Sequence, residues 1–161
     1  QEDFNTSVEL DVDAYIPPTY ILNELQKLDI YKRIAGVETQ SEYDDMKEEL
    51  LDRFGEIPKP ADNLLRIAMI RANAHKIYIT EVQGKEEVLK IVLKSDAPVE
   101  PTTIPILLAG FKDRLKFSMK GIPHFTYRYK KTGMVEKDAE NLLVLTENLL
   151  QEMKVITQKQ S

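Results

Sequence analysis

Few side chains in this sequence of 161 residues have the type and spacing that chemistry requires. Two pairs of neighbouring carboxylates, Asp44-Asp45 and Glu48-Glu49, could act as general acid and base. They fall in a stretch with helical periodicity, where acidic residues more simply form the solvated face. The two histidines, His75 and His124, are far apart and lack the His-x-x-x-His or cysteine partners of a zinc site. The residues therefore predict neither a catalytic nor a metal-binding site.

The sequence also lacks the residues needed for nucleotide hydrolysis and for thiol chemistry. The six glycines are isolated from one another, and none belongs to a Gly-x-x-x-x-Gly-Lys-Ser/Thr phosphate loop. Cysteine is absent, which excludes disulfides, thiol catalysis and thiolate metal ligands. We therefore expect that the chain is not an enzyme and binds no cofactor.

Composition and charge indicate an ordinary globular domain. Hydrophobic residues make up 42% of the chain and charged residues 30%, which favours neither a disordered nor a membrane protein. The 22 Lys and Arg against 27 Asp and Glu give a net charge of -5, which argues against non-specific nucleic-acid binding by the whole chain. No apolar run approaches the roughly 20 residues of a membrane helix. The lack of cysteine fits a reducing cytoplasm.

A short strand and a long helix are predicted at the start of the chain. Alternation over 8–12 predicts a half-buried strand, which Pro17-Pro18 stops. A helix is predicted over 19–35, because apolar residues recur there at spacings of three and four. Its predicted buried stripe comprises Ile21, Leu22, Leu25, Leu28, Tyr31, Ile34 and Ala35.

Two further helices are predicted before residue 77. The second helix opens at Thr39 or Ser41, because Thr39 and Glu42 have the spacing of a capping box, and Gly55 ends it. The third helix, over about 60–76, is apolar nearly all round, which indicates a central helix packed on several sides.

The hydrophobic period changes to two in the second half, which indicates β-structure. In chain order we expect two strands, a short helix, two strands and a terminal helix, over 77–83, 88–94, 103–109, 114–120, 124–130 and 136–155. The first hairpin should turn at Gly84-Lys85. The predicted fold is α+β: an antiparallel sheet of four to five strands with helices packed mainly on one face.

Alternation along the strands assigns the two faces of this sheet. The side facing the helices should carry Leu89, Ile91, Leu93, Leu115, Phe117, Met119, Phe125, Tyr127 and Tyr129. The opposite side should carry Lys90, Lys94, Arg114, Lys116, Lys120, Arg128 and Lys130. This basic sheet face could bind nucleic acid, but single-strand binders stack bases on aromatic rings that share a face with the cations. A solvated face whose lysines protect the sheet edges is therefore the favoured interpretation.

The predicted second helix carries the densest charge in the chain. Its acidic residues include Glu42, Asp45, Glu48, Glu49 and Asp52. The only basic residues in the same stretch are Lys47 and Arg53. Such a helix could dock on an arginine-rich partner surface, or it could simply face solvent.

Several motifs together resemble one known family. They are Val8-Glu9-Leu10, Ala14-Tyr15-Ile16-Pro17, Leu28-Asp29-Ile30-Tyr31-Lys32-Arg33-Ile34-Ala35, Glu49-Leu50-Leu51-Asp52-Arg53-Phe54-Gly55 and Pro58. This pattern resembles the C-terminal domains of bacterial transcription-repair coupling factors, over about 8–155. The resemblance is carried by residues before Ile77, and after it by the order of the strands.

The resemblance implies a regulatory role within a larger protein. Family members are ATP-driven DNA translocases that remove stalled RNA polymerase, and their motor lies outside this chain. The C-terminal domain would pack against the N-terminal repair-recruitment domain, mask its UvrA-binding surface and restrain the motor. UvrA, RNA polymerase and DNA would thus be indirect partners in the cytoplasm, with no membrane partner. The alternative is a nucleic-acid-binding module that uses the basic sheet face.

The same resemblance implies domain limits and a contact surface. Residues 1–7 would be a linker remnant, 8–156 a single regulatory domain and 157–161 a polar tail. The expected partner contacts are polar residues of the motif stretch, namely Lys32, Arg33, Glu48, Glu49, Asp52 and Arg53. These residues could instead have a structural role, with Arg33 and Asp52 joining the first two helices.

Overall fold

The computed structural model describes residues 4–158, and the parts of the predicted linker and tail at 1–3 and 159–161 lie outside them. Two compact units divide the chain. The helical unit comprises Val12–Ala72, and the sheet unit comprises the residues before Val12 together with those from Asn73 onward. The predicted domain limits at residues 8 and 156 stay predictions.

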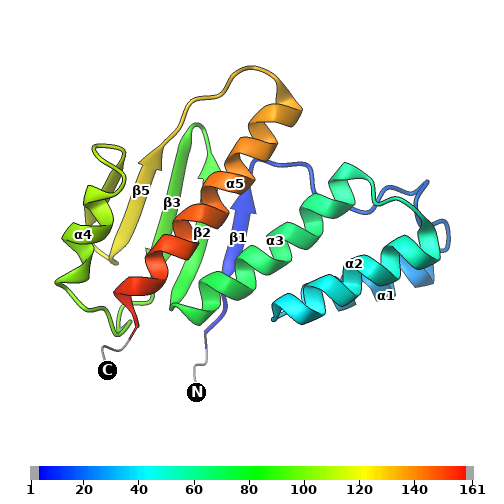
Figure 1. Ribbon diagram of the computed structural model, residues 1–161, viewed down its shortest axis with the longest axis horizontal. Coiled ribbons are helices and arrows are strands. Elements are labelled where there is room, and N and C mark those ends of the chain that lie inside the picture. The colour runs from blue at the N-terminus through cyan, green and yellow to red at the C-terminus, as the bar shows by residue number, and fades with distance from the viewer. Residues whose placement is uncertain (1–3, 159–161) are drawn as a thin grey trace. The chain divides into compact units, whose positions relative to one another are not determined.

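The sheet unit is built on one five-stranded sheet (Figure 1). Its strands are β1 (Ser7–Leu10), β2 (Ile79–Lys85), β3 (Val88–Leu93), β4 (Leu115–Ser118) and β5 (His124–Arg128). Their order across the sheet is β1-β2-β3-β5-β4, with β1 parallel to β2 and every other pair antiparallel. The predicted α+β class is therefore confirmed.

One face of the sheet carries the core of this unit. Helix α5 (Val135–Met153) crosses that face (Figure 1), and a 3₁₀ turn (Lys154–Ile156) follows it. In the register, Ile91 pairs with Phe125 and Phe125 with Phe117, whose two phenyl centroids are 4.7 Å apart. Ile91 and Phe125 are fully buried, as the alternation predicted. The short helix α4 (Thr103–Ala109) agrees with its predicted bounds.

Two predictions about the strands were wrong. Met119 lies beyond the end of β4 and is 69% exposed, because the strand stops at Ser118 and no longer holds it to the core side. The first hairpin turns at Glu86 and Glu87, whose φ angles are 54° and 64°, and not at Gly84-Lys85. Positive φ at both central residues is the geometry of the tight hairpin turn that glycine and asparagine favour, so glutamates gave no signal for it.

Gly84 lies inside β2 for a packing reason. A Cβ atom at this position would lie 2.8 Å from Cδ2 of Leu10 and 3.2 Å from Cδ1 of Leu142. The glycine therefore lets β1 and α5 approach β2 closely, which is the second common use of glycine in strands.

The helical unit contains α1 (Glu24–Ala35), α2 (Gln40–Phe54) and most of α3 (Lys59–Lys76), which passes into the sheet unit after Ala72. The buried members of its core are Ile16, Ile21, Ile30, Ile34, Val37, Met46, Leu50, Leu65 and Ala68. Tyr31 ties the incoming chain to this core, because its hydroxyl accepts a hydrogen bond of 2.8 Å from the backbone N–H of Ile16.

The predicted first helix begins five residues late, and half of its predicted stripe is exposed. Asn23 is the N-cap, and its side chain accepts a hydrogen bond from the backbone N–H of Gln26 at 3.0 Å. The core stripe of α1 is formed by Ile30 and Ile34. Three predicted core leucines instead face solvent: Leu22, Leu25 and Leu28. Leu22 precedes the N-cap and is outside the helix, whereas Leu25 and Leu28 lie on a different face of α1 from the one that is buried.

Candidate docking surface on helix α2

The sequence at the start of α2 fixes which of its side chains point outward. Thr39 accepts a hydrogen bond from the N–H of Glu42 at 3.1 Å, and Glu42 accepts one from the N–H of Thr39 at 3.2 Å. This is the predicted capping box. With Met46 and Leu50 buried, the face of α2 that carries the remaining acidic residues is directed to solvent. Glu42 itself is occupied by the cap.

Glu49 joins two arginines from two helices. Its carboxylate accepts hydrogen bonds from both terminal guanidinium nitrogens of Arg33 on α1, of which the Nη1 bond is 2.6 Å long, and one of 2.6 Å from Arg53. Arg53 stands on α2 one turn after Glu49, and its guanidinium lies 4.9 Å from the ring centroid of Phe54. The structural alternative was that Arg33 and Asp52 join the first two helices. Arg33 does join them, and its acidic partner on α2 is Glu49.

The charge of Glu49 is stabilised by this arrangement. Its hydrogen bonds with Arg33 and then Arg53 lower the pKa of the carboxyl from 4.5 to about 2. The same carboxylate raises the pKa of Arg33. Because two cations surround one carboxylate, this network is structural and holds α1 against α2.

Beside the network lies an open hollow in which the carboxylates other than Glu49 remain available. It has a volume of about 650 Å³ and is lined by Asp45, Glu48, Glu49, Leu51 and Asp52. Within residues 4–158, Asp45, Glu48 and Asp52 form no ion pair and accept no side-chain hydrogen bond. We refer to these four residues, Asp45, Glu48, Leu51 and Asp52, as the acidic face.

Leu51 is the member of the acidic face that the sequence did not reveal. Its side chain is 49% exposed, whereas its neighbour Leu50 is 1% exposed. From the sequence, both Leu50 and Leu51 would be expected in the core. Successive residues of a helix point in directions about 100° apart, so Leu50 faces the core while Leu51 faces solvent. An exposed leucine among three free carboxylates is a contact point for an apolar side chain with cations around it.

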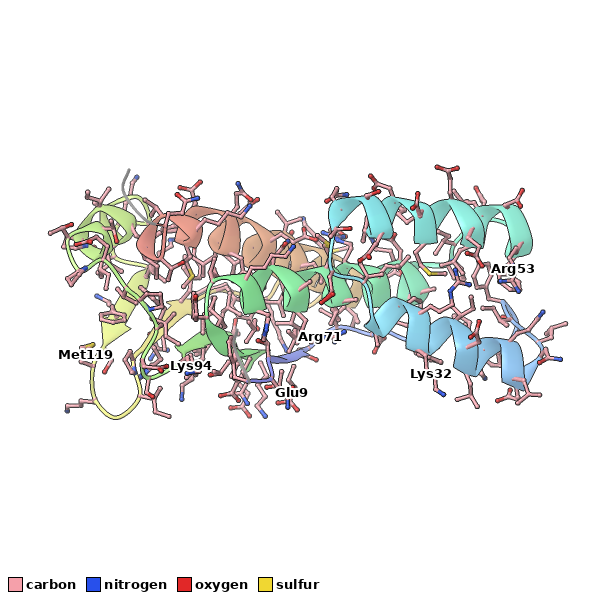
Figure 2. All side chains as sticks on the ribbon, turned by 90° about the horizontal axis from the view of Figure 1, so that it is seen from below. Glu9, Lys32, Arg53, Arg71, Lys94 and Met119 are labelled. Carbon is pink, nitrogen blue, oxygen red and sulfur yellow. The ribbon has the colours of Figure 1, made fainter. Side chains whose placement is uncertain are left out.

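The predicted contact residues thus separate into two groups. Five of them are brought together at α2 and the facing side of α1: Arg33, Glu48, Glu49, Asp52 and Arg53. Lys32 is not among them. Its side chain projects from α1 on the side away from α2, whereas Arg53 lies at the end of α2 next to α1 (Figure 2).

The basic sheet face is less concentrated than the sequence suggested. Lys90 and Lys116 both pair with Thr126, so the three residues form one row on the uncovered side. The same row continues across the sheet, because Lys90 pairs with Gln83 and Gln83 with Glu9. The row of lysines therefore also contains a carboxylate. The aromatic rings of β4 and β5 alternate with these residues and lie on the helix-covered side. This geometry does not provide a stacking platform for bases.

Among residues 4–158, no group of three or more His, Asp or Glu side chains is placed to hold a metal ion. In the same part of the chain, no helix combines the length and apolar character that crossing a membrane would require.

The chain matches known proteins over more than half of its length. The family model for the TRCF domain matches residues 10–104. The transcription-repair-coupling factor of Bacillus subtilis is 32% identical over 99 residues, which are 62% of this chain and 8% of that protein. The Escherichia coli factor is 42% identical over 82 residues, 51% of this chain and 7% of that protein. The chain thus spans less than a tenth of these relatives, and the match is to the TRCF domain and not to the ATPase motor region.

The whole fold is shared with a solved structure. The crystal structure of the C-terminal domain of a transcription-repair coupling factor superposes with a TM-score of 0.75 and 27% identity, over 96% of this chain and 98% of that one. That domain was therefore crystallised as a separate folded piece. The chain belongs to the TRCF domain family, the C-terminal domains of bacterial transcription-repair coupling factors.

Proposed function

We propose that this domain is a regulatory clamp that docks on the N-terminal repair-recruitment domain of its own coupling factor. The observation that carries the proposal is the acidic face, in which three free carboxylates surround half-exposed Leu51. A partner surface with two or three arginines around an apolar side chain would complement it in charge and shape.

The chemistry of the acidic face suits a contact that opens and closes. Glu48 and Asp52 are exposed, so they remain hydrated when the partner leaves, and their release costs little. Interfaces between domains of one chain are typically polar and modest in area. In this proposal Glu48, Asp52 and Leu51 contact the partner, while Arg33 and Arg53 hold Glu49 and the two helices in place.

Docking would hide the surface of the N-terminal domain that binds UvrA and would restrain the DNA translocase. Engagement of stalled RNA polymerase would release the clamp, expose that surface and free the motor. The domain would thus act in the bacterial cytoplasm, without chemistry of its own, by a change in which surfaces are covered.

The experiment is calorimetric titration of this chain with the N-terminal repair-recruitment domain of the same coupling factor. We expect binding that is lost in the double variant Glu48→Lys, Asp52→Lys. The matched control is Glu100→Lys, Asp113→Lys, which changes net charge equally at exposed positions of the sheet unit. Equal binding by both double variants would refute the acidic face as the contact.

Duplex and single-stranded DNA are titrated in parallel to test the alternative. A nucleic-acid-binding module would bind DNA, keep binding in the Glu48→Lys, Asp52→Lys variant and lose it in Lys116→Glu, Arg128→Glu. That result would refute the regulatory clamp and support a nucleic-acid-binding module that uses the basic sheet face.

A further inference from the structure

A second face of the helical unit has an apolar character that its own fold does not explain. Leu22, Leu25 and Leu28 are 81%, 79% and 58% exposed. We call these three residues the leucine stripe. Scattered exposed leucines are normal on a protein surface, but here Leu25 and Leu28 stand one turn apart on α1 and Leu22 directly precedes its N-cap, Asn23.

The two members of the stripe that belong to α1 lie on the side opposite to its buried residues. Ile30 and Ile34 face the core, while Leu25 and Leu28 stand one turn apart on the outer side. Lys32 follows Leu28 by four residues, so it extends the same line by one more turn. It projects away from α2 (Figure 2), which separates this face from the acidic face.

Lys32 places one positive charge at the end of the apolar stripe, so a partner should carry a negative charge there. The nearby Lys27 already pairs with Glu24, with a distance of 3.0 Å between Nζ and Oε2. Lys32 is exposed and forms no ion pair within residues 4–158. The surface therefore offers an apolar ridge followed by one free cation.

We propose that the leucine stripe docks an amphipathic helix from another part of the coupling factor, with apolar positions three and four residues apart and a carboxylate opposite Lys32. Ridges of this kind pack into the grooves between such positions on a facing helix. This inference extends the proposed function to a second contact on the opposite side of the same unit.

The size of the stripe argues for a partner within the same protein. Three leucine side chains expose about a few hundred Å², the scale of the largest apolar patch on an ordinary monomer. Stable association of free proteins, including two copies of one chain, buries about 1,200–2,000 Å² in total. A covalent tether supplies an effective concentration of about 1 mM and makes a small contact sufficient. More than nine tenths of the relatives' length lies outside the matched region, so such a partner has room to exist.

Thiol accessibility tests the proposal directly, because this chain contains no cysteine. Single cysteines are introduced as Leu25→Cys, on the stripe, or as Gln26→Cys, an exposed control on the same helix. Each is measured in this chain alone and in the complete coupling factor with its other cysteines replaced. If the stripe is covered for about nine tenths of the time, the thiol at position 25 reacts about tenfold more slowly in the complete protein. The thiol at position 26 should change little, and Lys32→Glu should restore much of the reactivity at position 25.

Two results would overturn the inference. Equal reactivity at position 25 in the chain alone and in the complete protein would show that nothing covers the stripe. Protection that develops in the chain alone as its concentration rises would identify a second copy as the occupant. The proposed function fails separately. If the unaltered chain does not bind the N-terminal domain in calorimetry while position 25 is still protected in the complete protein, the acidic face alone is refuted. If the unaltered chain binds but position 25 is equally reactive in both proteins, the stripe alone is refuted.

Discussion

Replacing Glu49 by glutamine tests whether the ion-pair network holds the helical unit together. The variant keeps the size of the side chain and removes the charge that Arg33 and Arg53 share. At about 1.4 kcal/mol per pKa unit, the lowering from 4.5 to about 2 would correspond to ~3 kcal/mol. The two arginine side chains are 42% and 36% exposed, so solvent screening reduces the expected loss to ~1 kcal/mol.

The pH dependence of this loss identifies its cause. Because the pKa of Glu49 is lower in the folded than in the unfolded chain, its contribution is present above pH 4.5 and is lost as the pH falls towards about 2. Urea unfolding of the unaltered chain and of Glu49→Gln can be monitored by circular dichroism. Their free energies of unfolding should differ by ~1 kcal/mol at pH 7, and this difference should shrink between pH 4.5 and pH 2.

A neighbouring residue provides the control for Glu49→Gln. Glu48→Gln removes an equal charge from the next position on α2, where no ion pair is formed within the described residues, and should change stability by less than ~0.5 kcal/mol. If Glu49→Gln lowered the free energy of unfolding equally at pH 7 and at pH 2.5, the reasoning would be refuted, because the ionised carboxylate could not then be the source of the loss.

Three other substitutions probe particular contacts by the same unfolding measurement. Gly84→Ala should destabilise by ~1–2 kcal/mol, because the new methyl group crowds Leu10 and α5; unchanged stability would mean that these side chains move aside freely. Thr39→Ala should cost ~1 kcal/mol through loss of the α2 cap, and Thr39→Ser should restore most of it. Tyr31→Phe should cost ~1 kcal/mol, because the N–H of Ile16 loses its 2.8 Å partner; a smaller effect would indicate that water replaces the hydroxyl.

Local signals in the sequence predicted the parts of this fold that local chemistry determines. The capping box at Thr39 was readable because its two hydrogen bonds join residues three apart. The fold class and the buried row through Ile91 followed from alternation, which needs no knowledge of the partner strand. The parallel pairing of β1 with β2 was not readable, since it joins segments that are distant in sequence.

The errors on α1 and in the β2–β3 turn have one kind of cause. Periodicity shows that a helix has an apolar stripe, but α1 has two, and only packing in three dimensions selects Ile30 over Leu25 for the core. Likewise Gly84 looked like a turn residue, yet the approach of α5 places it in a strand. Of the candidate contact surface, the sequence indicated the carboxylates and missed Leu51, whose exposure depends on where its neighbours pack.

The insertion of the helical unit into the sheet unit has a consequence for the order of folding. Glu9 of β1 pairs with Gln83 of β2, 74 residues later, so β1 is synthesised before the helical unit and its partner strand only after it. Closing so long a loop carries an entropic cost that grows with the logarithm of its length. If Val12–Ala72 collapses first, the flexible part of that loop becomes much shorter. A substitution that weakens the helical core would then also delay the docking of β1, and would leave the edge of β2 exposed to aggregation during synthesis.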